Sequence, residues 1–431
     1  MRHRLILRTL VAALAAAGIG SAFADDDRSH HDQAKKALIQ ARTKIFGIEN
    51  VDQKSGELPK DKVVFSWLGH IAGAVSLRGR IIMIDTFIAR LEVTPGRTPI
   101  VIKDLVDLKP EAMFIGHGHG DHADNAAFIA AKTGATLYMS PEACGTAQTA
   151  LARMKKDPFM QADAFFAIPQ DAIVRCVGLT GAGSVPGTQV VRIMQLEPQV
   201  CINAYRALHS VAVPVDPDWG EIVVVDTPDP NDAKWFPPGV PLTPTNPRQP
   251  GQQDLRQGNG PGGPDQINYQ FVVRAGTNFT LSANASVGAM KEGLGSNWPN
   301  GKPEDGKRIL DLIRRMPPTD LAFSTVSSGN TDQNGWRDHV YWAEALRPKI
   351  MTTGHAPVGA AMQYYSGFLN QLKLMEFPRA EWPGFPREQW PAVRNHTDPT
   401  DILKPEVYEI DDPAWQDPKK ENKRAMREFC G

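Results

Sequence analysis

The sequence predicts an α/β fold in which short buried strands alternate with helices around a large core. Short apolar runs bounded by Gly or Arg recur along the chain, which is typical of buried strands. Helical stretches stand between these runs, as expected for layered α/β proteins. The 431 residues are 42% hydrophobic and 22% charged. This composition suffices for a sizeable core and excludes a disordered or fibrous chain.

Residues 1–24 have the features of a secretory signal peptide. They carry Arg2, Arg4 and Arg8, then an apolar run that ends in the small-residue site Ala22-Phe23-Ala24. We therefore expect the mature chain to begin near Asp25 and to be periplasmic or secreted. Without this segment the chain has 44 basic and 48 acidic residues and no basic block, which argues against a nucleic-acid partner. No other apolar run has the roughly 18 to 20 residues of a membrane helix, so no membrane partner is expected after processing.

The remaining chain divides into three parts. Residues 25–60 form a polar N-terminal segment with a helix predicted over 31–45. The main domain is expected over residues 61–376, and residues 377–431, rich in Pro and Trp, are expected to form an irregular C-terminal extension. The domain opens with elements predicted in this order: strands over 63–68 and 81–85, a helix over 102–108, a strand over 112–115, and a helix over 125–132 that Gly134 ends.

An insertion over residues 228–266 interrupts the main domain. Sixteen of its 39 residues are Pro or Gly, so it cannot pack as a core. Strand patterns resume over 269–273 and 279–281, which indicates that the domain continues after it. The insertion is either a surface loop or a lid over a pocket, and its role stays open at this stage.

Four cysteines allow three complete pairings, between which the sequence does not decide. Export permits disulfides, and the 25-residue spacing of Cys176 and Cys201 across a pair of predicted strands favours a bridge between them. The alternative is that one or more cysteines are free and buried. Cys144 and Cys430 show no CxxC or Cys/His spacing, which excludes a zinc-finger type of structural site.

Four metal-capable side chains follow the predicted strand 112–115 within six positions, in the segment His117-Gly-His119-Gly-Asp121-His122. In an extended loop His117 and His119 point to the same side, because side chains alternate with a period of two. Asp121 and His122 lie where the chain turns into the next helix. This pattern predicts two neighbouring metal sites that need further ligands from elsewhere in the chain. Solvated loop histidines are the alternative, which so dense a cluster makes improbable.

This H-x-H-x-D-H motif resembles the signature of the metallo-β-lactamase superfamily. Trp67-Leu68-Gly69-His70 and Ile84-Asp85 are similar to the opening hairpin of that superfamily, especially of its sugar-phosphate lactonase branch. The resemblance covers residues 63–358. It implies a four-layer αββα fold, and a centre of one or two divalent ions, with zinc as the expected metal.

In the superfamily two later histidines complete the centre. His209, after the predicted strand over 189–196, resembles the third motif and is assigned to the first site with His117 and His119. His355 resembles the last motif and is assigned to the second site with Asp121 and His122. Asp121 is also the candidate catalytic residue.

The other histidines receive structural interpretations. We expect His70 to be a hydrogen-bonded neighbour of the centre and not a ligand. We expect His30, His31 and His339 to be solvated, and His396 to have no place in the centre.

The sequence departs from the superfamily at the fourth motif, where an aspartate normally bridges both ions. One alignment places Asn284 there, and a competing one uses Asp226 at the end of the strand predicted over 221–225. For Asp226 the alternative is a turn residue at a strand end. An amide oxygen is neutral, so Asn284 would bridge only weakly, and the second site should then bind its ion less tightly.

The resemblance implies hydrolysis, because a zinc-type ion lowers the pKa of bound water from 15.7 to about 7 and polarises the carbonyl or phosphoryl group that the resulting hydroxide attacks. Export and slight acidity favour a small ester, lactone or amide as substrate, with a phosphoester as a further candidate. A non-catalytic metal-binding protein and a redox metalloprotein on the same fold remain alternatives. The sequence leaves the general acid and the oligomeric state open.

Overall fold

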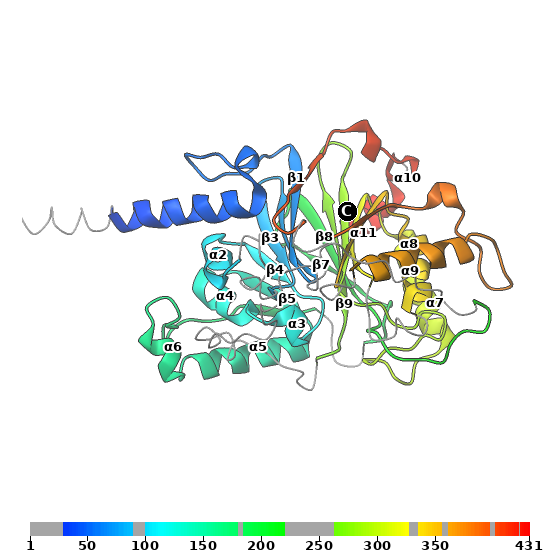
Figure 1. Cartoon of the computed structure of the whole chain (residues 1–431), viewed down its shortest axis with the longest axis horizontal. Coiled ribbons are helices and arrows are strands. Elements are labelled where there is room, and N and C mark those ends of the chain that lie inside the picture. The colour runs from blue at the N-terminus through cyan, green and yellow to red at the C-terminus, as the bar shows by residue number, and fades with distance from the viewer. Residues whose placement is uncertain are drawn as a thin grey trace, which may run out of the picture.

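Two seven-stranded sheets lie side by side at the centre of the molecule, with helices on both outer faces (Figure 1). The computed structural model describes residues 29–88, 100–179, 184–219, 263–326, 335–355, 361–396, 401–421 and 423–431. The expected signal peptide, Asp226 and most of the insertion over 228–266 lie outside these residues. Within the described ranges, no helix is long and apolar enough to cross a membrane.

The first sheet is mixed and has the strand order β14-β1-β2-β3-β4-β5-β6. Its strands are β1 (Lys62–Gly69), β2 (Ala72–Leu77), β3 (Arg80–Ile84), β4 (Ala112–Phe114), β5 (Thr136–Met139), β6 (Cys176–Gly178) and β14 (Glu406–Glu409). The second sheet has the order β13-β12-β11-β10-β9-β8-β7. Its strands are β7 (Val190–Ile193), β8 (Val200–Arg206), β9 (Ile267–Val273), β10 (Thr280–Asn284), β11 (Leu321–Thr325), β12 (Ile350–Gly354) and β13 (Ala392–Asn395).

Helices form the two outer layers, so the predicted four-layer αββα arrangement is confirmed. Beside the first sheet lie α2 (Ile102–Asp107), α4 (Ala126–Thr133), α5 (Pro141–Met154) and α6 (Pro158–Ala162). Beside the second lie α7 (Pro303–Arg315), α8 (Gly335–Leu346) and α9 (Ala361–Leu374). Shorter elements are η1 (Ile48–Asn50), α3 (Gly120–Ala123), η3 (Arg387–Gln389), η4 (Pro413–Trp415), α10 (Pro418–Glu421) and α11 (Arg424–Cys430), and a further helix spans 29–46.

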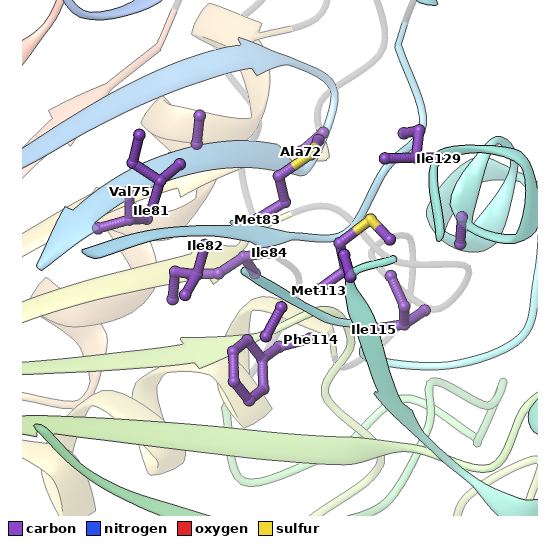
Figure 2. Close-up of a cluster of buried hydrophobic side chains, with 14 of the residues drawn as sticks. Ala72, Val75, Ile81, Ile82, Met83, Ile84, Met113, Phe114, Ile115 and Ile129 are labelled. Carbon is purple, nitrogen blue, oxygen red and sulfur yellow. The ribbon is translucent and has the colours of Figure 1, made fainter. Parts of the chain in front are cut away.

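Successive side chains of β4 point to opposite faces of the first sheet and pack in two different interfaces. Figure 2 shows Met113 pointing toward the helix that carries Ile129, whereas Phe114 points to the opposite side of the sheet. Phe114 meets Phe271 of the second sheet with ring centroids 4.9 Å apart. Both phenylalanines are fully buried, so the aromatic core between the sheets holds the two layers together.

The strand directions bring the functional residues to one edge of each sheet. β1, β3 and β4 run in the same direction, because β2 is antiparallel to both β1 and β3, and β4 is parallel to β3. In the second sheet β8, β10, β11 and β12 likewise share one direction. Residues after the carboxyl ends of these strands therefore gather at common edges, where ligands of layered α/β proteins usually bind.

The C-terminal extension differs from the irregular segment that the sequence predicted. It supplies an edge strand to each sheet: β14 pairs antiparallel with β1, and β13 pairs parallel with β12. The strands are only four residues long, and their pairing partners are distant in sequence. Such short edge strands carry little apolar patterning of their own, which explains why the sequence did not reveal them.

The expected disulfide between Cys176 and Cys201 is wrong. Cys176 lies on β6 of the first sheet and pairs with Cys144 on α5, while Cys201 lies on β8 of the second sheet and pairs with Cys430 on α11. The two predicted partners belong to different sheets, so their spacing along the chain does not reflect closeness in space. Both disulfides attach a helix to a strand.

Candidate metal centre

The H-x-H-x-D-H segment spans the loop after β4 and most of α3, and its conformation depends on a close backbone approach. A Cβ atom on Gly116 would lie 2.3 Å from the Cβ of Ala285, so only glycine fits at this position. The Gly116 amide donates a hydrogen bond to Asp85 Oδ1 at 2.8 Å. The loop then presents His117 and His119 before α3 begins at Gly120.

His117, His119 and His209 form a first cluster, the three-histidine group. One ligand atom of each lies within 4.8 Å of the others. His117 and His209 are buried, and His119 is partly exposed. The structure thus brings together the three residues that the sequence assigns to the first site.

The hydrogen bonds of this group orient its free nitrogens toward one another. His117 Nδ1 lies 3.0 Å from the Gln266 side-chain oxygen, and His209 Nδ1 lies 3.1 Å from the Ser210 carbonyl oxygen. Both acceptors require a protonated Nδ1, so each Nε2 keeps a lone pair. These two Nε2 atoms are only 3.2 Å apart. Two facing lone pairs at this distance repel each other, and a cation between them removes the repulsion.

His70, Asp121, His122 and His355 form a second cluster, the four-donor group, in which one ligand atom of each residue again lies within 4.8 Å of the others. The sequence assigns three of these residues to the second site, but it treats His70 as a neighbour and not as a ligand. In the structure His70 Nε2 lies 3.2 Å from Asp121 Oδ2, the hydrogen-bonded position that the sequence predicted, and its ring centroid lies 4.1 Å from that of His355.

Asp85 orients the central histidine of the four-donor group. His122 Nδ1 lies 2.8 Å from Asp85 Oδ2, and both side chains are almost fully buried. This bond directs the lone pair of His122 Nε2 toward His355 Nε2, 3.1 Å away. A carboxylate behind a histidine ligand is a common device that fixes the ring and its tautomer at a metal site.

The electrostatics of both groups favour neutral imidazoles. Burial, followed by the neighbouring histidines, lowers the pKa of His70 and of His209 to about 4. The same causes hold the pKa of His117 and His122 well below the ordinary value. Neutral imidazole is the form that binds metal. Burial opposes ionisation of Asp121, yet hydrogen bonds from His355 and His70 lower its pKa, so it is a carboxylate at neutral pH.

Asn284 is placed differently from the bridging residue that the sequence predicted. Its side-chain oxygen accepts hydrogen bonds from Ser324 Oγ at 2.8 Å and from the Thr325 amide at 3.2 Å. These contacts hold the Asn284 side chain against β11. The competing candidate, Asp226, lies outside the described residues.

The remaining histidines differ in burial. His30 and His31 are exposed on the N-terminal helix, as expected. His339 is fully buried in α8, which contradicts the prediction of a solvated side chain. His396 lies outside both groups and is buried, with its Nε2 2.7 Å from Glu406 Oε1 and its ring stacked on Trp67. Burial on α8 and at the end of β13 follows from the packing of distant elements.

The two groups fit divalent metal ions. They offer imidazole nitrogens and one carboxylate, which are ligands of zinc and of related transition metals. The Nε2 atoms of His117 and His209, and those of His122 and His355, face each other at about hydrogen-bond distance. Partners behind the rings fix the tautomers of His117, His209 and His122. The arrangement therefore suits two neighbouring ions, one in each group.

The sequence matches no protein-family model. It is 36% identical over 72 residues to a UPF0173 metal-dependent hydrolase of Methanopyrus kandleri, a match that covers 17% of this chain and 28% of the relative. The chain therefore aligns with less than a third of that protein's length.

Two solved structures are similar over most of the chain. The metallo hydrolase Igni18 of Ignicoccus hospitalis is 14% identical with a TM-score of 0.40, and the alignment covers 81% of this chain and 99% of Igni18. The metallo-beta-lactamase fold protein YhfI of Bacillus subtilis is 8% identical with a TM-score of 0.39 and the same coverage. At these scores the strand order and the layers described above remain the basis of the fold assignment. The proteins to which this chain is similar are thus named as a metal-dependent hydrolase, a metallo hydrolase and a metallo-beta-lactamase fold protein.

Proposed function

We propose that this chain is an exported metal-dependent hydrolase of a small ester, lactone or amide. The observation that carries the proposal is the three-histidine group, in which three neutral imidazoles converge beside a second group that contains a carboxylate. A divalent ion, with zinc as the expected metal, would supply Lewis acidity and an activated water at neutral pH. No serine or cysteine nucleophile is then needed.

The residues of the chain have distinct tasks in this proposal. His117, His119 and His209 are the ligands whose neutral state leaves the positive charge of an ion undiminished. The Gln266 side-chain oxygen and the Ser210 carbonyl oxygen hold the rings of His117 and His209 in place through their Nδ1 atoms, at 3.0 Å and 3.1 Å. These bonds preserve the tautomers that direct Nε2 into the site.

The partly exposed side of the two groups is the place where a substrate can reach them. The side chain of Asp121 is 42% exposed, and His119 is partly exposed, whereas His117 and His122 are buried. A substrate can therefore reach this side of the two groups. The acidic net charge and the expected signal peptide support a small, exported-compartment substrate over a nucleic acid.

A substrate screen with matched variants tests the proposal. Purified full-length chain is stripped with a chelator, reloaded with Zn²⁺ and assayed against ester, lactone, β-lactam and phosphodiester substrates. His119→Ala should abolish turnover with the fold intact, since this side chain is partly exposed and its loss removes one of three ligands. His31→Ala, an exposed histidine on the N-terminal helix, should leave turnover unchanged. Turnover that survives chelation, or that is equal in the two variants, would contradict a metal-dependent hydrolase.

A further inference from the structure

The two groups differ in the number of ligands that the protein supplies. The four-donor group brings together four side chains, and the three-histidine group brings together three. Structural zinc sites have four protein ligands, whereas catalytic sites have three and an open position. We propose that His70 is the fourth ligand of a closed site, and that the three-histidine group is the open site. This inference rests on the proposed function only for the role of the open site.

Four of the six distances between ligand atoms of the four-donor group are close to those of a tetrahedral set of ligands, and all six are within 4.8 Å. Ligands at the usual zinc distances of 2.0–2.1 Å occupy corners that are about 3.3 Å apart. Asp121 Oδ2 lies 3.2, 3.5 and 3.3 Å from the Nε2 atoms of His70, His122 and His355. His122 Nε2 and His355 Nε2 are 3.1 Å apart. His70 thus stands at the same distance from the carboxylate as the two assigned histidines do.

The backbone around His70 holds its ring in this position. The His70 carbonyl oxygen accepts hydrogen bonds from Trp67 Nε1 and from the His355 amide, both at 2.8 Å. His70 and His355 both adopt left-handed backbone conformations, with φ of 50° and 69°. Such conformations cost energy in residues other than glycine and persist where the surroundings impose them, often at functional sites. The bond between the two backbones couples the placement of both ligands.

The charges also distinguish the two groups. The four-donor group contains the carboxylate of Asp121, and the three-histidine group has no acidic ligand. A carboxylate offsets part of the charge of a divalent ion, and this favours retention of the ion. The sequence predicts a weak second site from a neutral bridge at Asn284, whose side-chain oxygen accepts hydrogen bonds from Ser324 and Thr325 in the structure. We therefore expect the opposite order of affinity, with the closed site filled first.

An ion in the closed site would connect three parts of the fold. His70 lies in the turn between β1 and β2, Asp121 and His122 lie in α3, and His355 follows β12 of the other sheet. The ion would thus join the carboxyl-end edges of both sheets. With four protein ligands it has no free tetrahedral position for substrate, so its role is to fix the geometry beside the open site.

Cobalt titration of the full-length apo chain tests the assignment, because the visible bands of Co²⁺ report coordination number independently of activity. The wild-type chain should bind its first equivalent with the intense bands of a four-coordinate ion. His70→Asn is the variant of choice, since asparagine tolerates the left-handed backbone and is too short to replace the imidazole. In this variant the affinity for the first Co²⁺ should fall by more than about 10- to 100-fold. Loss of a ligand's hydrogen-bonding partner alone typically costs that much, and here the ligand itself is lost. The visible bands of the variant should also change, as water replaces the nitrogen.

The controls separate this inference from the proposed function. His31→Asn, which is exposed, should behave as the wild type does. Unchanged affinity and bands in His70→Asn would overturn the assignment of His70 and leave the hydrolase proposal intact. Failure of the wild type to bind any ion would instead contradict the hydrolase proposal. If His70→Asn does not fold, X-ray absorption of the His119→Ala chain with one equivalent of Zn²⁺ decides, because the three-histidine group then offers only two imidazoles. Three imidazoles in a four-coordinate shell support the closed site, and fewer imidazoles overturn it.

Discussion

Replacement of Asp85 by asparagine should weaken metal binding at the four-donor group while it leaves the fold stable. Asp85 accepts hydrogen bonds from His122 Nδ1 and from the Gly116 amide, both at 2.8 Å. Asparagine has one acceptor oxygen and one donor amide in place of these two acceptors. Either His122 or Gly116 therefore loses its acceptor. If His122 loses it, the tautomer that directs the Nε2 lone pair at the metal is no longer favoured.

The expected loss of affinity follows from the position of Asp85 behind a ligand. Loss of such a partner typically costs about 10- to 100-fold, or roughly 1.4 to 2.7 kcal/mol. The apo protein should respond differently. Burial raises the pKa of Asp85 well above its ordinary value, so the native carboxylate is itself unfavourable in the absence of metal. A neutral amide removes this cost, which offsets the roughly 1 to 3 kcal/mol of the lost acceptor, so the free energy of unfolding of the apo chain should change by less than about 1 kcal/mol.

Two measurements on the same variants test this separation. Zn²⁺ affinity is measured by competition with a chelator in a His119→Ala background, where the three-histidine group lacks a ligand, and stability is measured by urea unfolding of the apo chain. Asp320→Asn is the matched control, because Asp320 is also buried but pairs with Lys420 away from both groups. It should destabilise the chain by about 3 to 5 kcal/mol without changing metal affinity. Unchanged Zn²⁺ affinity in Asp85→Asn, or a loss of stability as large as that of the control, would refute the reasoning.

Three further outcomes follow from the buried groups and the disulfides. His396→Ala should lower the free energy of unfolding by about 2 to 3 kcal/mol, because the buried Glu406 carboxylate loses a partner at 2.7 Å. A free energy of unfolding within about 0.5 kcal/mol of the wild-type value would contradict this. The apo chain should lose stability as pH falls from about 6.5 to 4. The pKa of His70 and of His209 is about 4 in the folded chain, so the unfolded chain binds more protons in this pH range. An equal free energy of urea unfolding at pH 7.5 and at pH 5 would contradict this. Cys430→Ser should lower the free energy of unfolding by up to about 5 kcal/mol and Cys144→Ser by up to about 4 kcal/mol. The reason is that the Cys201–Cys430 disulfide closes a loop of 229 residues and the Cys144–Cys176 disulfide a loop of only 32. An equal or a larger loss of thermal stability in Cys144→Ser would contradict this.

The elements next to the motif could be predicted from the sequence because their signals are local. The strand over 112–115 is an unbroken apolar run, and Gly134 ends the following helix in the left-handed conformation typical of such caps. The H-x-H-x-D-H spacing likewise places four metal-capable side chains on one loop. His209 and His355 could be assigned because their settings resemble the third and last motifs of the superfamily, and the strands that precede them, β8 and β12, run in the same direction.

The features that the sequence did not reveal depend on contacts between distant segments. His70 enters the four-donor group because β1 runs in the same direction as β3 and β4. Its position directly after a strand was a usable signal, although only the sheet order shows which edge that strand end joins. The disulfide pairing and the burial of His396 depend on where α11 and β13 pack, which no local pattern specifies.

Stepwise addition of Co²⁺ to the apo chain, with visible absorption and hydrolysis recorded on the same samples, tests the central claim most directly. The first equivalent should give the bands of a four-coordinate ion and little turnover, because it fills the closed four-donor group. The second equivalent should bind in the three-histidine group and bring turnover to its full rate. Full turnover after a single equivalent would contradict the division into a closed and an open site, and no turnover of any ester, lactone, amide or phosphoester with both equivalents bound would contradict the proposed hydrolase.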